Sequence, residues 1–415
     1  MIIHNPTRRA LFWNINKEIL MTPQLALLYI KPSIDDYNNY IASKGIFYAS
    51  SPGGYRPICG MFFIPPRTKW SLKNSFLEYI CEQGAISFLK KPSLEQICNV
   101  TRKISSVSSQ RVAVELSGGL DSTIIFSVLQ SLGLKVSLIG FTSDRFEFRT
   151  ERVVQDILAE KAPDSILINE KDAGLFSDLD LAPAYPMPSA SALFHIRHSA
   201  LATAAKKNEV DLLLTGMGGD SVFIDSVPYS KKIPELLLSG WSYQDYWSQD
   251  LIYSKNGIEH YCAYSIRDIQ RNILSLRKGK GEDRMKLWAR KYFKGLLPVE
   301  LSEYSYKASH DGMYAESLQQ KSHEIIYLMK DVHNTLGIQD FSPDNISQVI
   351  EEWNMLDQTE QQYFFSNLTY ATWFRGIQDL RRGALDSDPK EELSSEEKTI
   401  VYDISSKPPA TIEWE

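Results

Sequence analysis

A short glycine-rich segment carries the clearest chemistry in the sequence. Ser117 to Ser122 reads Ser-Gly-Gly-Leu-Asp-Ser and directly follows the mainly apolar run Val112 to Leu116. Glycines let a backbone approach an anion closely, and serine hydroxyls add hydrogen-bond donors. A helix that begins at such a loop also points its partial positive end at the same place. The segment is therefore predicted to hold the pyrophosphate or triphosphate part of a nucleotide.

A second glycine-rich segment lies further along the chain. Gly216 to Ser221 reads Gly-Met-Gly-Gly-Asp-Ser and follows the apolar run Asp211 to Thr215. Ligands of open parallel sheets bind at the carboxyl ends of the strands, so Asp121 and Asp220 are expected to face each other across a cleft. Because proteins usually hold Mg²⁺ with carboxylates and phosphate oxygens, both aspartates are predicted metal ligands.

Strands that alternate with helices are expected to position both segments. The expected strands are short apolar runs at 112–116, 135–142, 165–169 and 211–215. The expected helices span 121–132, 149–161 and 190–207. Such alternation implies right-handed crossovers and a parallel sheet with helices on both faces. The predicted fold class is α/β, with a mainly helical part after Phe223.

The pattern of turns and charges divides the chain into three parts. Residues 1–92 are predicted to form a small β-rich domain, which a helix over 77–89 closes. Residues 93–385 are predicted to form the nucleotide-binding part, entered through a helix over 93–106. Residues 386–415 are acidic and polar, which predicts a flexible tail.

Composition limits the partners of the protein. The net charge of −6 lacks the basic surplus that is usual for nucleic-acid binders. The four cysteines form no Cys-x-x-Cys pair, which argues against a zinc site or a dense disulfide framework. Neither a secretory signal nor an apolar stretch of about 18 residues occurs. We therefore expect a cytoplasmic enzyme that binds neither nucleic acid nor a membrane.

The glycine-rich segments resemble the signatures of a known enzyme family. The first is similar to the loop of the PP-loop ATP pyrophosphatases and differs from the Gly-x-x-x-x-Gly-Lys loop of kinases. Together with Gly216 to Asp220 it resembles the asparagine synthetase family, whose pattern is SGGxDS followed by GxGxDE. Two more segments resemble that family, namely Lys286 to Arg290 (Lys-Leu-Trp-Ala-Arg) and Lys307 to Gly312 (Lys-Ala-Ser-His-Asp-Gly).

The resemblance implies an enzyme that uses ATP and Mg²⁺ and releases AMP and pyrophosphate. A substrate carboxylate attacks the α phosphate, and an amine then attacks the acyl-adenylate to form an amide. Lys307, or in second place Lys286, is expected to stabilise the charge that develops during this transfer. His310 is a candidate for assisting the proton transfer, as are His195 and Asp311. The residues predicted to line the nucleotide site are Leu116, Ser117, Gly118, Gly119, Leu120, Asp121, Ser122, Phe141, Thr142, Gly216 and Met217.

Three residues depart from the family pattern. Ile2 stands where glutamine-using members have a cysteine nucleophile, and an apolar side chain cannot attack an amide. The N-terminal part is therefore predicted to be a degenerate glutaminase-like remnant. Met217 stands where asparagine synthetases have a glutamate and β-lactam-forming relatives a tyrosine, and a thioether cannot carry the required proton. Ser221 likewise takes a position where the family often has glutamate.

These departures favour the branch of the family that joins a carboxylate and an amine of one molecule. Its members include the lasso-peptide macrolactam synthetases, so the preferred prediction is a lasso-type peptide cyclase. Such an enzyme acts on a peptide, and a peptidase or a leader-binding protein is a candidate partner. One alternative is a β-lactam or asparagine synthetase-like enzyme that takes a small-molecule carboxylate and ammonia or an internal amine. A second alternative is a nucleotide-binding scaffold without turnover.

Overall fold

The computed structural model describes most of the chain from residue 111 onward and separate parts of the N-terminal region. The described residues are 2–5, 11–14, 19–21, 26–27, 30–42, 59, 61–64, 68–73, 76–79, 111–162, 164–223, 242–265, 269, 273, 275–276, 285–303 and 308–386. Among these residues, no helix is both long enough and apolar enough to serve as a transmembrane segment.

A five-stranded parallel sheet forms the centre of the nucleotide-binding part. The strands lie in the order β11-β10-β7-β8-β9, and every neighbouring pair is parallel. Their bounds are β7 (Val112–Glu115), β8 (Val136–Thr142), β9 (Ile166–Asn169), β10 (Leu212–Thr215) and β11 (Glu259–Cys262). The first and fourth strands along this part of the chain, β7 and β10, are neighbours. Their carboxyl ends therefore bring the two glycine-rich loops together.

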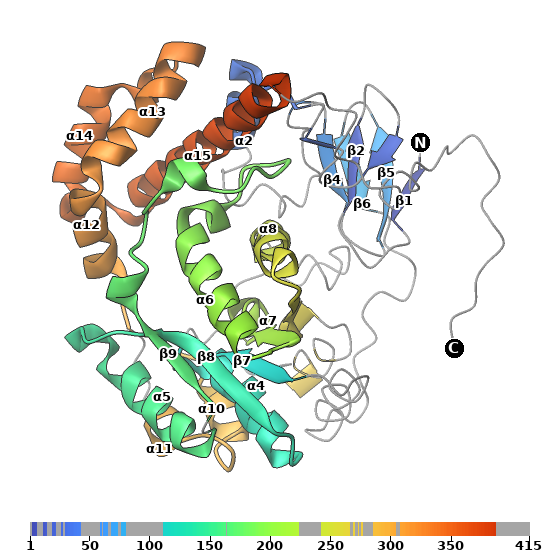
Figure 1. Ribbon diagram of the computed structural model, residues 1–415, viewed down its shortest axis with the longest axis vertical. Helices are drawn as coiled ribbons and strands as arrows, with labels where there is room; N and C mark the ends of the chain where they lie inside the picture. The colour runs from blue at the N-terminus through green and yellow to red at the C-terminus, as the bar shows by residue number, and fades with distance from the viewer. Residues whose placement is uncertain are drawn as a thin grey trace.

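Helices cover both faces of this sheet (Figure 1). The covering helices are α4 (Leu120–Ser131), α5 (Arg149–Lys161), α6 (His195–Lys207), α8 (Ser242–Lys255) and α10 (Leu287–Tyr292). Val114 and Leu214 pack in a core with α4, α5 and α10, whereas Ala113 and Leu213 pack in another with α6 and α8. Successive strand residues point to opposite faces, so one strand contributes to both cores. The predicted α/β fold class is confirmed.

A group of helices follows the sheet, as predicted. Its members are α11 (Val299–Ser302), α12 (Asp311–Gln320), α13 (Ser322–Leu336), α14 (Pro343–Glu351) and α15 (Gln358–Asp386). The N-terminal helix α2 (Ile34–Ala42) packs among them, because its Tyr37 and Tyr40 belong to the same apolar core as Tyr370 of α15. The Tyr37 hydroxyl also donates a hydrogen bond to Asp340 at 2.9 Å. The predicted tail lies outside the described residues beyond Asp386.

Two small antiparallel sheets make up the described strands of the N-terminal region. One has the order β1-β5-β6 and the other β3-β2-β4. Their strands are β1 (Ile2–Asn5), β2 (Leu11–Asn14), β3 (Ile19–Met21), β4 (Met61–Ile64), β5 (Thr68–Lys73) and β6 (Phe76–Tyr79). The β-rich character is thus confirmed. The predicted boundary at residue 92 and the helix over 93–106 lie outside the described residues.

Two expectations about individual elements are wrong. The helix over 77–89 does not begin at Leu77, because 76–79 pair with β5 as strand β6, and the aromatic residues there favour a strand. Beyond Phe223 a fifth strand, β11, adds to the edge of the sheet beside β10. Its four residues, Glu-His-Tyr-Cys, lack the apolar run that reveals a buried strand, so only the pairing with β10 identifies it.

Candidate active site

The first glycine-rich loop joins β7 to α4 in a conformation that only glycine permits at one position. Gly118 has a φ of +81°, and a Cβ atom there would lie 2.3 Å from the carbonyl oxygen of Glu151. Inside the loop, the Ser117 and Ser122 hydroxyls lie 3.1 Å apart, and the Gly119 N–H donates to Ser117 Oγ at 3.1 Å. The loop is therefore held in a fixed shape at the amino end of α4.

The second loop packs directly against the first. It leads from β10 into the short helix α7 (Gly219–Phe223), and a Cβ atom at Gly219 would lie 2.3 Å from Cγ of Asp121. A larger residue at this position would push the Asp121 carboxylate away. The hydroxyl of Tyr264 also donates a hydrogen bond to the Asp121 carbonyl at 2.7 Å. Both contacts fix Asp121 at the junction of the loops.

Lys286 joins the two predicted metal ligands. Its Nζ lies 2.6 Å from a carboxylate oxygen of Asp121 and 2.6 Å from one of Asp220. The Lys286 side chain is only 8% exposed, and its backbone has a left-handed φ of +56°, which is costly for a residue with a side chain. Burial alone would lower the pKa of Lys286, but the Asp121 and Asp220 carboxylates outweigh burial and raise it. The ammonium group therefore stays charged.

The two aspartates suit a partial rather than a complete metal site. They converge on one point, as their shared contact with Lys286 demonstrates. No group of three or more His, Cys, Asp or Glu side chains is arranged as a metal site within the described part of the chain. Mg²⁺ commonly uses one or two carboxylates and completes its octahedral shell with phosphate oxygens and water. Asp121 and Asp220 thus fit Mg²⁺ that arrives with a nucleotide.

A cavity of about 470 Å³ opens beside the two loops at the carboxyl ends of the strands. Of the residues predicted for the site, Gly118 does not line the cavity, and Lys307 lies outside the described residues. The predicted residues that line the cavity are Leu116, Ser117, Gly119, Leu120, Asp121, Ser122, Phe141, Thr142, Gly216, Met217, Asp220, Lys286 and His310. The structure thus brings residues from five separate segments to one cavity, while their individual roles remain predictions.

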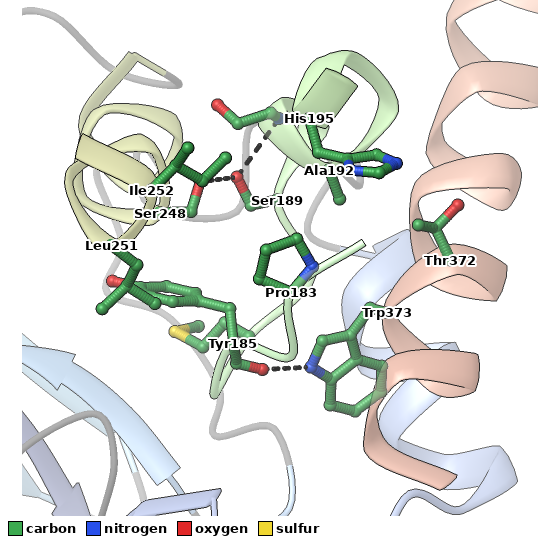
Figure 2. Close-up of a pocket in the computed structure, with 12 residues that line it drawn as sticks. Pro183, Tyr185, Ser189, Ala192, His195, Ser248, Leu251, Ile252, Thr372 and Trp373 are labelled. Atoms are coloured by element: carbon green, nitrogen blue, oxygen red, sulfur yellow. Dashed lines mark hydrogen bonds between the residues drawn. The ribbon is translucent and has the colours of Figure 1, made fainter. Parts of the chain in front are cut away.

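The three further candidates for proton transfer lie in different surroundings. His310 lines the cavity with its ring 5.0 Å from the Phe148 ring, whereas the Asp311 carboxylate accepts a hydrogen bond from the Ser309 hydroxyl at 2.7 Å. His195 lines a different, water-sized cavity of about 20 Å³ between α6, α8 and α15 (Figure 2). Its Nε2 lies 2.7 Å from the Asp178 carbonyl oxygen, and burial lowers its pKa. His195 therefore has a packing role there.

Several residues outside the predicted set shape the cavity. Gln155 is buried in α5, and its amide donates hydrogen bonds to the carbonyls of Leu116 at 3.2 Å and Phe141 at 2.7 Å, which fixes the ends of two strands. Glu170 accepts a hydrogen bond from the Ser143 hydroxyl at 2.7 Å and one from Arg145 Nε at 3.0 Å. The only sequence signal for Gln155 is a polar residue beside apolar positions of an amphipathic helix.

Arg197 forms part of the same wall. Its guanidinium lies 5.1 Å from the centre of the Phe141 ring and 3.8 Å from Glu170, and its Nε donates to the Ala173 carbonyl at 3.2 Å. Burial lowers the pKa of Arg197, and Glu170 offsets part of this effect. One wall of the cavity is thus an ionic network in which each buried charge has an opposite partner.

Comparison with known sequences identifies the family to which the chain belongs. No curated protein sequence matches the chain significantly. The family model described as asparagine synthase matches residues 100–364, which is more than half of the chain. This match covers both glycine-rich loops, Lys286 and the ionic wall. The chain therefore belongs to the asparagine synthase family, whose general activity is ATP-dependent, AMP-forming ligation.

Proposed function

We propose that the protein adenylates a substrate carboxylate with ATP and transfers the acyl group to an amine. The observation that carries this proposal is the Lys286 ammonium held 2.6 Å from both Asp121 and Asp220 beside the glycine loop. Both aspartates come from the ends of adjacent parallel strands, where a nucleotide binds. The pair can hold Mg²⁺ with the pyrophosphate, and Lys286 adds positive charge where the leaving group becomes more negative.

The proposed reaction has two balanced steps. A carboxylate oxygen attacks the α phosphorus of ATP, and the bond to the β phosphate oxygen breaks to release pyrophosphate. An amine then attacks the acyl carbon, AMP leaves, and the amine nitrogen loses one proton. In this scheme the described residues around Lys286 serve the first step. The second step needs an acceptor for the proton.

The preferred substrate is a peptide that supplies both reacting groups, as in a lasso-type macrolactam cyclase. Two residues support this choice. Ile2, at the start of β1, provides no nucleophile for releasing ammonia from glutamine. Met217 lines the cavity with a thioether in the place of a glutamate or a tyrosine, which disfavours close likeness to asparagine or β-lactam synthetases. A peptidase or leader-binding protein is the proposed partner for delivering such a peptide.

Product analysis tests the proposal directly. The protein is incubated with ATP, Mg²⁺ and short peptides that carry a free amino terminus and an internal Asp or Glu. We expect AMP, pyrophosphate and a peptide lighter by one water, and we expect none of them from Asp121→Asn, which loses a charge at constant size. Release of ADP and phosphate would contradict the adenylation mechanism. AMP formation only with small carboxylates and ammonia would support the small-molecule alternative, and nucleotide binding without turnover the scaffold.

A further inference from the structure

Among the described residues, five carboxylates line the cavity, and four of them are already engaged. Asp121 and Asp220 share Lys286, and Glu170 is paired with Arg145. Glu151 accepts a hydrogen bond from the Ala308 N–H at 3.1 Å, which ties α5 to the segment next to Lys307. The fifth is Glu115, the last residue of β7, which forms no ion pair with any described residue. Its surroundings therefore differ from those of the other four.

A hydrogen-bonded chain orients Glu115 toward the second loop. Thr215 lies beside Glu115 in the parallel pairing of β10 and β7. The Met217 N–H donates to Thr215 Oγ1 at 3.3 Å, so the Thr215 hydroxyl proton is left to donate to the Glu115 carboxylate. Met217 has no side-chain group that can carry a proton. Its backbone N–H is linked through Thr215 to the Glu115 carboxylate on the adjacent strand.

The groups behind Glu115 provide no positive charge. Tyr253 of α8 interacts electrostatically with Glu115, and its ring stacks on that of His260 of β11 with the centres 4.4 Å apart. The His198 ring of α6 meets Tyr253 edge-on at 6.2 Å. Burial lowers the pKa of both histidines to about 3, so each is neutral. Burial raises the pKa of Glu115, and the hydrogen bond from Thr215 only partly offsets this.

From this geometry we infer that Glu115 accepts the proton from the amine that attacks the acyl-adenylate. The inference rests on the proposed function and names the base that Met217 cannot supply. An amine arrives from water mainly as an ammonium ion, which cannot attack a carbonyl. A carboxylate without a cationic partner attracts this ion and has a basicity suited to taking its proton. Asp121, Asp220 and Glu170 are less suitable, because each already forms an ion pair with a lysine or arginine.

The proposed step balances. The ammonium ion first loses one proton, which passes to a Glu115 carboxylate oxygen and from there to solvent. The nitrogen lone pair then forms the bond to the acyl carbon, the bond from that carbon to the AMP oxygen breaks, and the second proton released by nitrogen passes to the Glu115 carboxylate. The protonated Glu115 later returns this proton to solvent. The step requires no further reactant. The substrate class for this subsite is a primary amine that is cationic at neutral pH.

The test separates the two half-reactions in Glu115→Gln, which keeps the size and removes the proton acceptor. The matched control is Glu259→Gln, an exposed glutamate on strand β11 of the same sheet. With a peptide for which the wild type releases AMP, we expect Glu115→Gln to retain carboxylate-dependent exchange of pyrophosphate into ATP. Amide formation should fall about 10²–10⁴-fold, the usual contribution of general base catalysis. Hydroxylamine, which is largely uncharged at neutral pH, should restore AMP release as it traps the adenylate.

Two further readouts exclude a merely structural effect. Wild-type amide formation should rise with pH as Glu115 loses its proton, and this dependence should be absent in Glu115→Gln but present in Glu115→Asp. Normal amide formation by a folded Glu115→Gln would overturn the assignment, and so would equal loss of pyrophosphate exchange. A wild type that exchanges no pyrophosphate with any carboxylate would instead overturn the proposed function and this inference with it.

Discussion

Two polar clusters near the ends of β7 and β10 differ in the charge of their titratable groups. The charged cluster, Asp121, Asp220 and Lys286, adjoins the α4 side of the sheet, where Lys286 Nζ lies 5.5 Å from the centre of the Phe223 ring. The neutral cluster, His198, Tyr253 and His260, lies on the α6 and α8 side, next to the Glu115 carboxylate. Both clusters thus lie near the ends of the same two strands. Only in the charged cluster do opposite charges offset the unfavourable effect of burial on a charged group.

The difference teaches which interactions decide a protonation state in this protein. Burial alone lowers the pKa of a lysine or histidine and raises that of a glutamate or tyrosine. In the charged cluster, opposite charges at 2.6 Å overcome burial and raise the pKa of Lys286. In the neutral cluster no opposite charge offsets burial at either histidine. Burial lowers the pKa of His198 and His260 to about 3, and the positive charge of Arg197 adds to this effect at His198. The charged cluster suits binding of an anion with its metal, whereas the neutral cluster provides no cation to pair with the adjacent Glu115 carboxylate.

Lys286→Met should remove the main difference between the two clusters, because it removes the cation of the charged cluster. The variant keeps most of the apolar part of the side chain but leaves two carboxylates facing each other without a cation. We expect ATP-dependent turnover to fall about 10²–10³-fold, as for loss of one group that stabilises developing charge. Removing one partner of a fully buried pair costs about 3–5 kcal/mol, and a lower cost is expected here because the Asp220 side chain is 55% exposed. Chemical denaturation and AMP release measure the two effects.

A surface lysine provides the matched control. Lys294 lies 3.1 Å from Glu303, and both side chains are about half exposed or more, at 62% and 49%. Lys294→Met should therefore change the free energy of unfolding by less than about 1 kcal/mol and leave turnover unchanged. Equal effects of the two substitutions would show that burial of Lys286 has no special consequence.

Acidification should destabilise the protein through the neutral cluster. The folded-state pKa of His198 and of His260 is about 3, below the unfolded value of about 6.5. The unfolded chain therefore binds more protons, so the stabilisation is present above pH of about 6.5 and is lost as pH falls toward 3. From pH 7 to pH 5 each histidine should cost about 2 kcal/mol. Denaturation midpoints at both pH values measure this.

Replacing each histidine by glutamine, singly and together, separates their contributions. His260→Gln and His198→Gln should each reduce the loss of stability between pH 7 and pH 5, because glutamine does not titrate. His323, on α13 and away from the sheet, is the comparison residue. A pH dependence that survives in the double variant would assign the acid sensitivity to other groups.

The two clusters also differ in how far the sequence predicted them. The loop of Ser117 to Ser122 carries a local pattern, and the meeting of Asp121 and Asp220 was expected because both follow strands of a parallel sheet, whose carboxyl ends bind ligands. The contact between Lys286 and Asp121 spans 165 residues, and no local pattern specifies which lysine returns to the loop. Glu115 was read simply as part of an apolar strand. His260, whose ring stacks on that of Tyr253 beside Glu115, lies on the polar strand β11, which the apolar pattern did not predict.

The helices of the nucleotide-binding part were predicted more closely than the cavity walls. The helix expected over 149–161 has these bounds in the structure, because its apolar positions repeat with the helical period. By contrast, Arg145 and Glu170 meet only because β8 and β9 end side by side. Packing between distant segments decides such contacts, and a single sequence contains no periodic signal for them.

Two tyrosines, one in contact with each cluster, are expected to show the smallest difference in stability between the clusters. The Tyr264 hydroxyl donates to the Asp121 carbonyl at 2.7 Å in the charged cluster, whereas the buried Tyr253 hydroxyl has no hydrogen-bond partner among the described residues. Tyr264→Phe should therefore cost about 1 kcal/mol, and Tyr253→Phe should cost nothing measurable or stabilise slightly. Both rings keep their packing, so denaturation midpoints isolate the hydroxyls. A clear cost for Tyr253→Phe would reveal a partner for its hydroxyl, and Glu115 in its charged form would then be the first acceptor to examine.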